Sequence, residues 1–236
     1  MNIKIFSPLG LFVFMFSFLN QASVNAAIMA DYHFTSDSSA SSDVEALTSA
    51  GDWEFGSFAG NNTSPQPEIN AEEVQSTTGA TGLTGADGDT LAEALANDAF
   101  YSFTLNTGGN TVSFSQLTFD HSFTNGAGTT STIALFTSLT GFAEADQLAD
   151  FTFTSITGDT AVVPRSLTLS SIGELQDFTS NVEFRFYLYD NSDTGSRVTH
   201  VDNVMLEGTA AVIPEPASLW LVLCGFIGFL TLKSRK

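Results

Sequence analysis

Hydrophobic and polar positions alternate with a period of two through much of the chain beyond residue 100. In the clearest run, 182–189, one face carries Val182, Phe184, Phe186 and Leu188 and the other carries Glu183, Arg185, Tyr187 and Tyr189. Similar runs occupy 101–105, 112–119 and 151–154, and turn sequences such as 107–110, 125–126, 157–159 and 190–193 bound them. This pattern is typical of short antiparallel strands with one buried face, and it predicts an all-β antiparallel β-sandwich.

Helical signals are scarce in the same region. Thr90 and Glu93 have capping-box spacing, which predicts a short helix over 90–97. Residues 60–89 are polar and loop-like, so we expect a long excursion from the domain there. Among sandwich arrangements, the strand pattern favours a jelly roll.

The first 26 residues have the order of a secretory signal peptide. Lys4 precedes an apolar run of about 11 residues, 9–19, and small residues follow at 24–27. We expect cleavage after Ala26. The alternative, an N-terminal membrane anchor, is disfavoured because this run is too short to span about 30 Å of hydrocarbon.

Near the other end, 217–232 is an uncharged apolar segment, followed by the basic tail 233–236. As a helix it is about 24 Å long, which predicts one transmembrane helix with slight bilayer thinning. Basic residues stay on the cytoplasmic side, so the preceding domain, 27–211, is expected to face outward. Pro214 and Pro216 hold Glu215 extended and accessible, as suits a peptide read by a processing enzyme; the alternative is a linker that nothing recognises.

Charge is distributed unevenly along the chain. It has 7 Lys and Arg, 26 Asp and Glu and a net charge of −19. Removing Lys4, Glu215 and the three basic residues of 233–236 leaves 25 acidic and three basic residues, a net charge of −22 for 27–213. Nucleic acid and anionic membrane surfaces are therefore excluded as partners. The single cysteine, Cys224, lies in the apolar segment, so the domain has no disulfide.

The segment 212–218, with its Pro214-Glu215-Pro216 motif, the apolar helix and the basic tail together resemble the PEP-CTERM sorting signal of Gram-negative bacteria. The resemblance covers 212–236, and the interruption of the basic tail by Ser234 is a mild departure. It implies that an exosortase-type enzyme recognises the motif, so Pro214, Glu215 and Pro216 are substrate residues. It also implies transient anchoring in the inner membrane, then a place at the cell surface or in the extracellular exopolysaccharide and biofilm matrix.

The domain also resembles the β-sandwich bodies of PEP-CTERM carriers and, more loosely, jelly-roll carbohydrate-binding modules. The segments that carry this resemblance are 101–105, 182–189 and 201–208. Such modules often hold a structural calcium near the closing strand, which nominates Asp202. Clustered oxygens at Asp190 and Asp193 are a second calcium candidate, because hard cations prefer oxygen ligands; turn formation is the alternative role for these two residues.

Glycan binding has a candidate site on the outward face of 182–189. Tyr187 and Tyr189 can stack on sugar rings, and Arg185 can bind hydroxyl groups. The alternative is that Glu183 and Arg185 pair with neighbours on the sheet while the tyrosines cover them. Trp53 is expected to be packed rather than to form a binding platform.

No motif indicates catalysis. His33, His121 and His200 are the only histidines, and neither G-x-S-x-G nor H-E-x-x-H is present. The sequence therefore favours a non-enzymatic exported surface or extracellular-matrix protein. A carbohydrate-binding module that follows the same export route is the alternative, and a secreted glycoside hydrolase is the third hypothesis.

Overall fold

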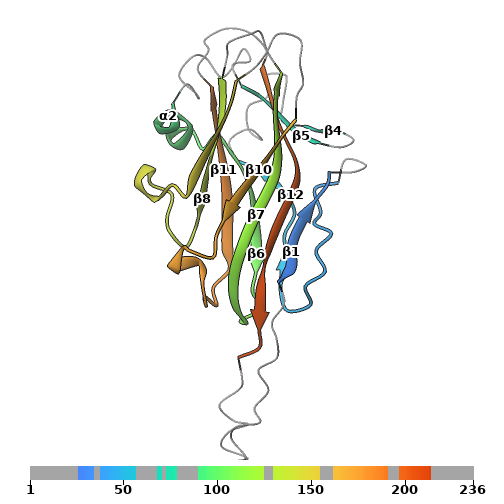
Figure 1. Ribbon diagram of the computed structural model, residues 1–236. Coiled ribbons are helices and arrows are strands. Elements are labelled where there is room, and N and C mark those ends of the chain that lie inside the picture. Colours follow the sequence, from blue (N-terminus) through green and yellow to red (C-terminus); the bar gives the residue numbers. More distant parts are fainter. Residues whose placement is uncertain are drawn as a thin grey trace, which may run out of the picture.

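The fold is a sandwich of two antiparallel β-sheets, seen in a computed structural model (Figure 1). The structure describes residues 26–34, 38–56, 68–70, 73–78, 90–124, 130–154, 162–190 and 197–213. Within these residues every hydrogen-bonded strand pair between the named strands is antiparallel. The predicted fold class is therefore confirmed, while the jelly-roll arrangement stays a prediction.

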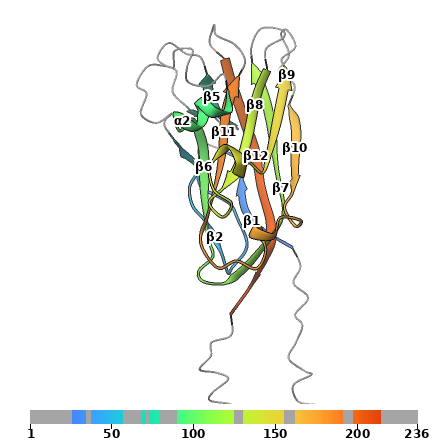
Figure 2. The ribbon, with the colours of Figure 1, turned by 90° about the vertical axis from the view of Figure 1, so that its left-hand side faces the viewer.

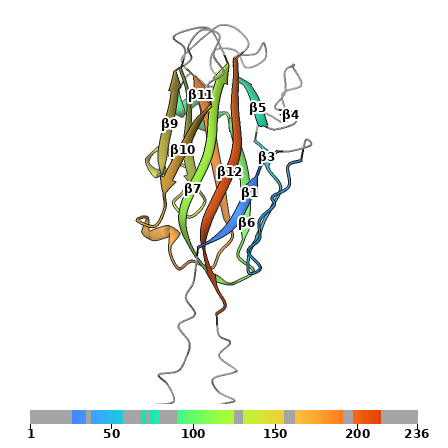
Figure 3. The same ribbon diagram turned by 45° about the vertical axis from the view of Figure 1, so that its right-hand side comes forward.

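One sheet, called sheet A, has the strand order β10-β7-β12-β5-β4, and β1 also pairs with β12. Its strands are β1 (Ala27–Tyr32), β4 (Glu68–Asn70), β5 (Glu73–Thr78), β7 (Thr111–Thr124), β10 (Val163–Thr168) and β12 (Arg197–Ala211). The long β12 lies beside β7 on one edge and beside both β5 and β1 on the other. Figure 3 shows β10, β7, β12 and β1 side by side across this face.

The second sheet, sheet B, has the order β2-β6-β11-β8-β9, and β3 also pairs with β6. Its strands are β2 (Ser49–Ala50), β3 (Glu54–Phe55), β6 (Phe100–Asn106), β8 (Thr130–Thr137), β9 (Ala149–Thr154) and β11 (Val182–Asp190). Within the described ranges, three short helices lie in the connections: α2 (Leu91–Ala96), η3 (Glu144–Asp146) and η4 (Gly173–Leu175). In Figure 2, α2 lies near the upper part of β11 and β6.

The core between the sheets is built largely from aromatic side chains. Trp53 is 3% exposed, and its ring packs against those of Phe103 and Phe186 with centroid distances of 5.8 and 5.2 Å. Phe184 stacks on Phe103 at 5.1 Å. The expected packing of Trp53 and the inward face of 182–188 are therefore confirmed.

Local sequence signals account for several elements. The alternating runs at 101–105, 112–119, 151–154 and 182–189 lie in β6, β7, β9 and β11. The predicted helix over 90–97 is α2, with Thr90 as its N-cap and a complete capping box with Glu93. Two orphan backbone N–H groups are satisfied reciprocally in this way, which lets a helix of 6 residues form.

The prediction of a loop over 60–89 is wrong for 68–70 and 73–78, because these residues form β4 and β5. The sequence Glu73–Thr78 contains a single apolar residue, Val74, so it has no period-two signal. Its backbone nevertheless pairs with β12 over 197–201. Ladder hydrogen bonds to a long neighbouring strand can order a polar strand that lacks a buried apolar row.

Both ends of the domain lie at the same pole. Antiparallel pairing places Ala27 beside Gly208, three residues before the end of β12 at Ala211. Four predicted features lie outside the described residues: residues 1–25 of the signal peptide 1–26, the Pro214-Glu215-Pro216 motif, the helix 217–232 and the tail. The described part of the chain holds no helix with the length and apolarity to cross a membrane.

Candidate functional site

A groove of about 700 Å³ runs across the outer face of sheet A, the face turned away from sheet B. Four strands line it: β1 with Asp31 and, directly after its end, His33; β7 with Thr118 and Asp120; β10 with Pro164 and Ser166; and β12 with Asn203 and Met205. Hydrogen-bonding side chains share the lining with four apolar residues, Ile28, Phe119, Pro164 and Met205, and most of the exposed lining surface is apolar. This composition suits a ligand that presents both hydrogen-bonding groups and apolar surface.

A bulge in β12 places Asn203 in the groove. The register between β12 and β7 shifts between Asp202 and Met205, and Asn203 has a φ of 49°. Asn tolerates this left-handed conformation better than most residues, and its own backbone N–H donates to Asp202 Oδ1 at 2.7 Å. The extra residue separates Asp202 from the buried Val204 and leaves Asn203 exposed on the outer face.

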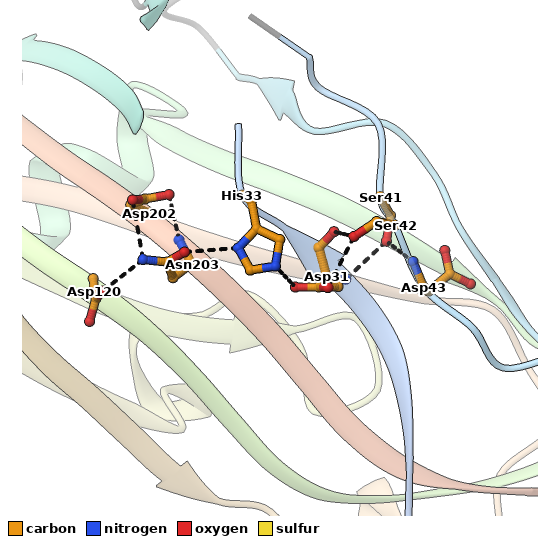
Figure 4. A network of polar contacts seen from close by, with 8 residues as sticks. All are labelled: Asp31, His33, Ser41, Ser42, Asp43, Asp120, Asp202 and Asn203. Atoms are coloured by element: carbon orange, nitrogen blue, oxygen red, sulfur yellow. Dashed lines mark hydrogen bonds and ion pairs between the residues drawn. The ribbon is translucent and has the colours of Figure 1, made fainter. Parts of the chain in front are cut away.

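Asn203 is the centre of a polar network that joins three strands (Figure 4). Its Nδ2 donates to Asp120 Oδ2 at 2.9 Å and to Asp202 Oδ2 at 3.2 Å. Its Oδ1 lies 2.8 Å from Nδ1 of His33. The side chains of β1, β7 and β12 are thereby held in one row.

The row continues through β1 to the segment after it. His33 Nε2 lies 2.9 Å from Asp31 Oδ1. Ser42 Oγ donates to the other carboxylate oxygen of Asp31 at 3.0 Å, and the backbone N–H of Asp31 donates to Ser41 Oγ at 2.9 Å. The orientation of the imidazole is therefore set from both sides.

This arrangement is not that of a nucleophilic triad. The serine hydroxyl contacts the carboxylate of Asp31, whereas a triad needs it on the imidazole, which here lies between Asp31 and Asn203. His121 lies on the opposite, inward side of β7, fully buried, and burial lowers its pKa to about 3. A base this weak and this far from solvent is unsuited to proton transfer near neutral pH.

The predicted glycan-binding residues lie on the outer face of sheet B, where they form a packed cluster. The Arg185 guanidinium carbon is 4.2 Å from the ring centroid of Phe100 and 3.9 Å from that of Phe142. Arg185 also donates to both carboxylate oxygens of Glu183, at 2.7 and 3.1 Å, and to Tyr187 Oη at 3.1 Å.

Tyr187 is 1% exposed, because its ring packs edge-on against Phe136 and at a tilt against Phe100. Helix α2 contacts β11 on this side of the molecule. Tyr189 is partly exposed. In this conformation Tyr187 has no free ring face for a sugar, so only Tyr189 remains accessible for the predicted stacking.

The predicted calcium ligands are not brought together. Asp202 lies on β12 in sheet A, and Asp190 is the last residue of β11 in sheet B. Asp193 and the side chain of Asp190 lie outside the described residues. Within the described ranges, no group of three or more His, Cys, Asp or Glu side chains is placed to hold a metal ion. Calcium binding stays a prediction.

The sequence analysis named Asp202 as a calcium candidate and His33 as one of three histidines. It did not predict that Asn203 connects the two on the outer face of sheet A. One signal was available: Val201-Asp202-Asn203-Val204 has two polar residues between two apolar ones, which breaks strict alternation. In a strand whose flanking residues are buried, this break indicates a bulge with both polar side chains on one face. The partners Asp31 and Asp120 are distant in sequence, and nothing local links them.

Comparison with known proteins gives no family and a weak structural likeness. No family model matches the chain, and no curated protein matches it. A solved structure of the K3 cleaved adhesin domain of Lys-gingipain from Porphyromonas gingivalis w83 is 14% identical, with a TM-score of 0.40, over 78% of this chain and 99% of that one.

Two carbohydrate-binding structures give similar values. A non-crystalline cellulose specific module, CBM28, is 15% identical with a TM-score of 0.38, over 65% of this chain and 86% of that one. The N-terminal cellulose-binding domain of Cellulomonas fimi β-1,4-glucanase C is 14% identical with a TM-score of 0.35, over 68% and 90%. Likeness at this level is too weak to carry an argument.

Proposed function

We propose that this chain is a non-enzymatic, exported glycan-binding protein whose ligand lies in the groove of sheet A. The observation that carries the proposal is the row formed by Asp31, His33, Asn203 and Asp120, held by hydrogen bonds along the groove. Carboxylate and amide groups that are fixed in this way can exchange hydrogen bonds with neighbouring hydroxyls at little further loss of conformational entropy.

The shape and charge of the groove narrow the class of glycan. The groove crosses β1, β12, β7 and β10, so a chain segment can lie along it without its ends being enclosed. The net charge of −22 over 27–213, together with Asp31, Asp120 and Asp202 on this face, disfavours polysaccharides rich in uronic acid or sulfate. We therefore expect a neutral polysaccharide.

Retention on immobilised polysaccharide tests the proposal. The full-length chain should be retained on a neutral β-glucan and pass through alginate, which is anionic. Asp120→Ala should weaken retention, because it removes a groove carboxylate that orients Asn203. Asp150→Ala is the matched control, since it removes the same charge from an exposed position on β9 in the other sheet. Equal retention of both variants and the unchanged chain would reject the groove.

The route to the cell surface is proposed from the C-terminal segment. We propose that an exosortase-type enzyme reads Pro214, Glu215 and Pro216 after the helix 217–232 has anchored the chain in the inner membrane. Because Ala27 and Gly208 are neighbours, both predicted processing positions flank the same pole, and the groove faces sideways from that attachment. Mass spectrometry of the protein from its native cell surface should find a C-terminus near Pro214–Pro216. A chain that still ends at Lys236 would contradict this route.

A hydrolase with a serine nucleophile is the activity that this network supports least, because Ser42 contacts the carboxylate of Asp31 and not the imidazole of His33. A panel of glycan and ester substrates offered to the full-length chain should release no product. Turnover that is lost in His33→Ala would reverse this part of the proposal.

A further inference from the structure

We propose that His33 is the pH-responsive positioning residue of the groove: as an imidazolium it holds Asn203 and Asp31 together, and loss of its proton releases one of them. The proposal concerns regulation of the groove, and its ligand-binding consequence rests on the proposed function above.

The orientation of the Asn203 amide is the first step of the argument. One end of this amide faces two carboxylate oxygens, at 2.9 Å from Asp120 and 3.2 Å from Asp202. Ionised carboxylates only accept hydrogen bonds, so that end must be the NH₂ group. The carbonyl oxygen, Oδ1, therefore faces His33, and the His33 Nδ1 that lies 2.8 Å away must carry a proton.

The other imidazole nitrogen faces a second acceptor. His33 Nε2 is 2.9 Å from Asp31 Oδ1, and this carboxylate can only accept. A neutral imidazole has one N–H and can serve only one of these two partners. Both contacts are satisfied together only when both nitrogens are protonated, which is the imidazolium form.

The charged groups around His33 favour this form. Asp31 lies on β1, which ends directly before His33, Asp202 lies on β12, and Asp120 on β7 acts through Asn203. On β10, the guanidinium of Arg165 donates to the backbone oxygen of Thr152 in sheet B at 2.6 Å and lies 6.0 Å from the Phe151 ring, so it is engaged away from His33. The hydrogen bond to Asn203 raises the pKa of His33 above its ordinary value; burial opposes this, and the Asp31 and Asp202 charges add to it.

The sign of the pH dependence follows. A histidine whose pKa is raised in the folded state contributes its stabilisation fully below the unfolded value, about 6.5, and loses it as pH rises through the folded value. Above the folded-state pKa, one of the two ring nitrogens has lost its proton. Its lone pair then faces an oxygen that can only accept a hydrogen bond, so that contact becomes repulsive. His33 then keeps only one of its two contacts, to Asn203 or to Asp31, and the groove row is no longer fixed, while the backbone pairing of β1 with β12 remains.

Nuclear magnetic resonance of the full-length chain tests the charge state without any ligand. The imidazole signals of His33 should titrate with a midpoint above 6.5, and the side-chain NH₂ signal of Asn203 should shift with the same midpoint. Asn203→Gly removes the acceptor while Gly accepts the positive φ without strain, so it should lower the midpoint of His33. A His33 midpoint at or below 6.5, unchanged by Asn203→Gly, would overturn the proposal.

Binding supplies the second readout. Retention on neutral β-glucan should fall by about threefold or more between about pH 5 and about pH 9, and His33→Gln should remove this dependence. His200→Gln is the matched control, because His200 lies on the same strand, β12, and should leave the dependence in place. Retention that is constant across this range in the unchanged chain would overturn the regulation. Absence of retention at every pH would instead reject the proposed function, and the titration of His33 would still decide its charge state.

Discussion

The outer faces of the two sheets carry similar polar chemistry but present it differently. On sheet B, Arg185 joins Glu183 and Tyr187, and the rings of Phe100 and Phe142 enclose its guanidinium. On sheet A, Asn203 joins acidic side chains and His33, whose side chain is 52% exposed. Packing against Phe100 and Phe142 encloses the first cluster, whereas His33 and Asn203 in the second remain exposed and open to a ligand. Burial of the cluster, more than its residue types, separates a structural role from a binding role.

Tyr187→Ala tests the closed face and should have the largest effect. It removes ring contacts to Phe100 and Phe136 and takes away a hydrogen-bond acceptor from Arg185. We expect the free energy of unfolding to fall by about 3–5 kcal/mol in urea titration. Tyr187→Phe keeps the ring and should lose about 1–2 kcal/mol. A Tyr187→Ala protein that is as stable as the unchanged chain but fails to bind glycan would move the binding site to sheet B.

His121 lies on the buried, inward face of β7, and it tests the pH response of the core independently of the groove. Because burial lowers its pKa to about 3, the folded state favours the neutral ring, so stability is present above about pH 6.5 and is lost as pH falls toward 3. Between about pH 7 and about pH 4 we expect a loss of about 3 kcal/mol from this group. His121→Leu should flatten that part of the urea-derived profile. An identical pH profile for His121→Leu would show that the ring is not held neutral.

Asn203→Gly tests the open face and should change stability least. Its exposed side chain leaves no cavity, so we expect less than about 1 kcal/mol of change in the free energy of unfolding. Retention on neutral β-glucan should fall about tenfold, which corresponds to about 1.4 kcal/mol of binding free energy. A variant that unfolds more readily without weaker retention would make Asn203 a residue of stability, like Tyr187.

The sequence predicted elements whose signals are local. The alternation in 182–189 identified β11 because one face is buried core, and Thr90 with Glu93 identified α2 because a capping box is complete within four residues. Strand β8 escaped this reasoning. Its residues 133–136, Ile-Ala-Leu-Phe, form an unbroken apolar run without alternation, which fits a strand that is buried on both faces.

The candidate site was less predictable than the fold. The face that alternation assigned to Arg185 and Tyr187 is correct, but its burial depends on Phe100 and Phe142, which come from other parts of the chain. The groove likewise depends on pairing that brings Asp31 and Asp120 to Asn203 from positions 172 and 83 residues away. Contacts at such separations are set by strand order and register, and no local pattern encodes them.

The most direct test of the central claim is to map the ligand on the molecule. A soluble neutral β-glucan oligosaccharide would be titrated into isotope-labelled full-length chain while backbone amide signals are followed by nuclear magnetic resonance. We predict shifts at Asp31, Asp120 and Asn203 and unchanged signals at Arg185 and Tyr189. Shifts confined to Arg185 and Tyr189, with the sheet A signals unmoved, would contradict the account.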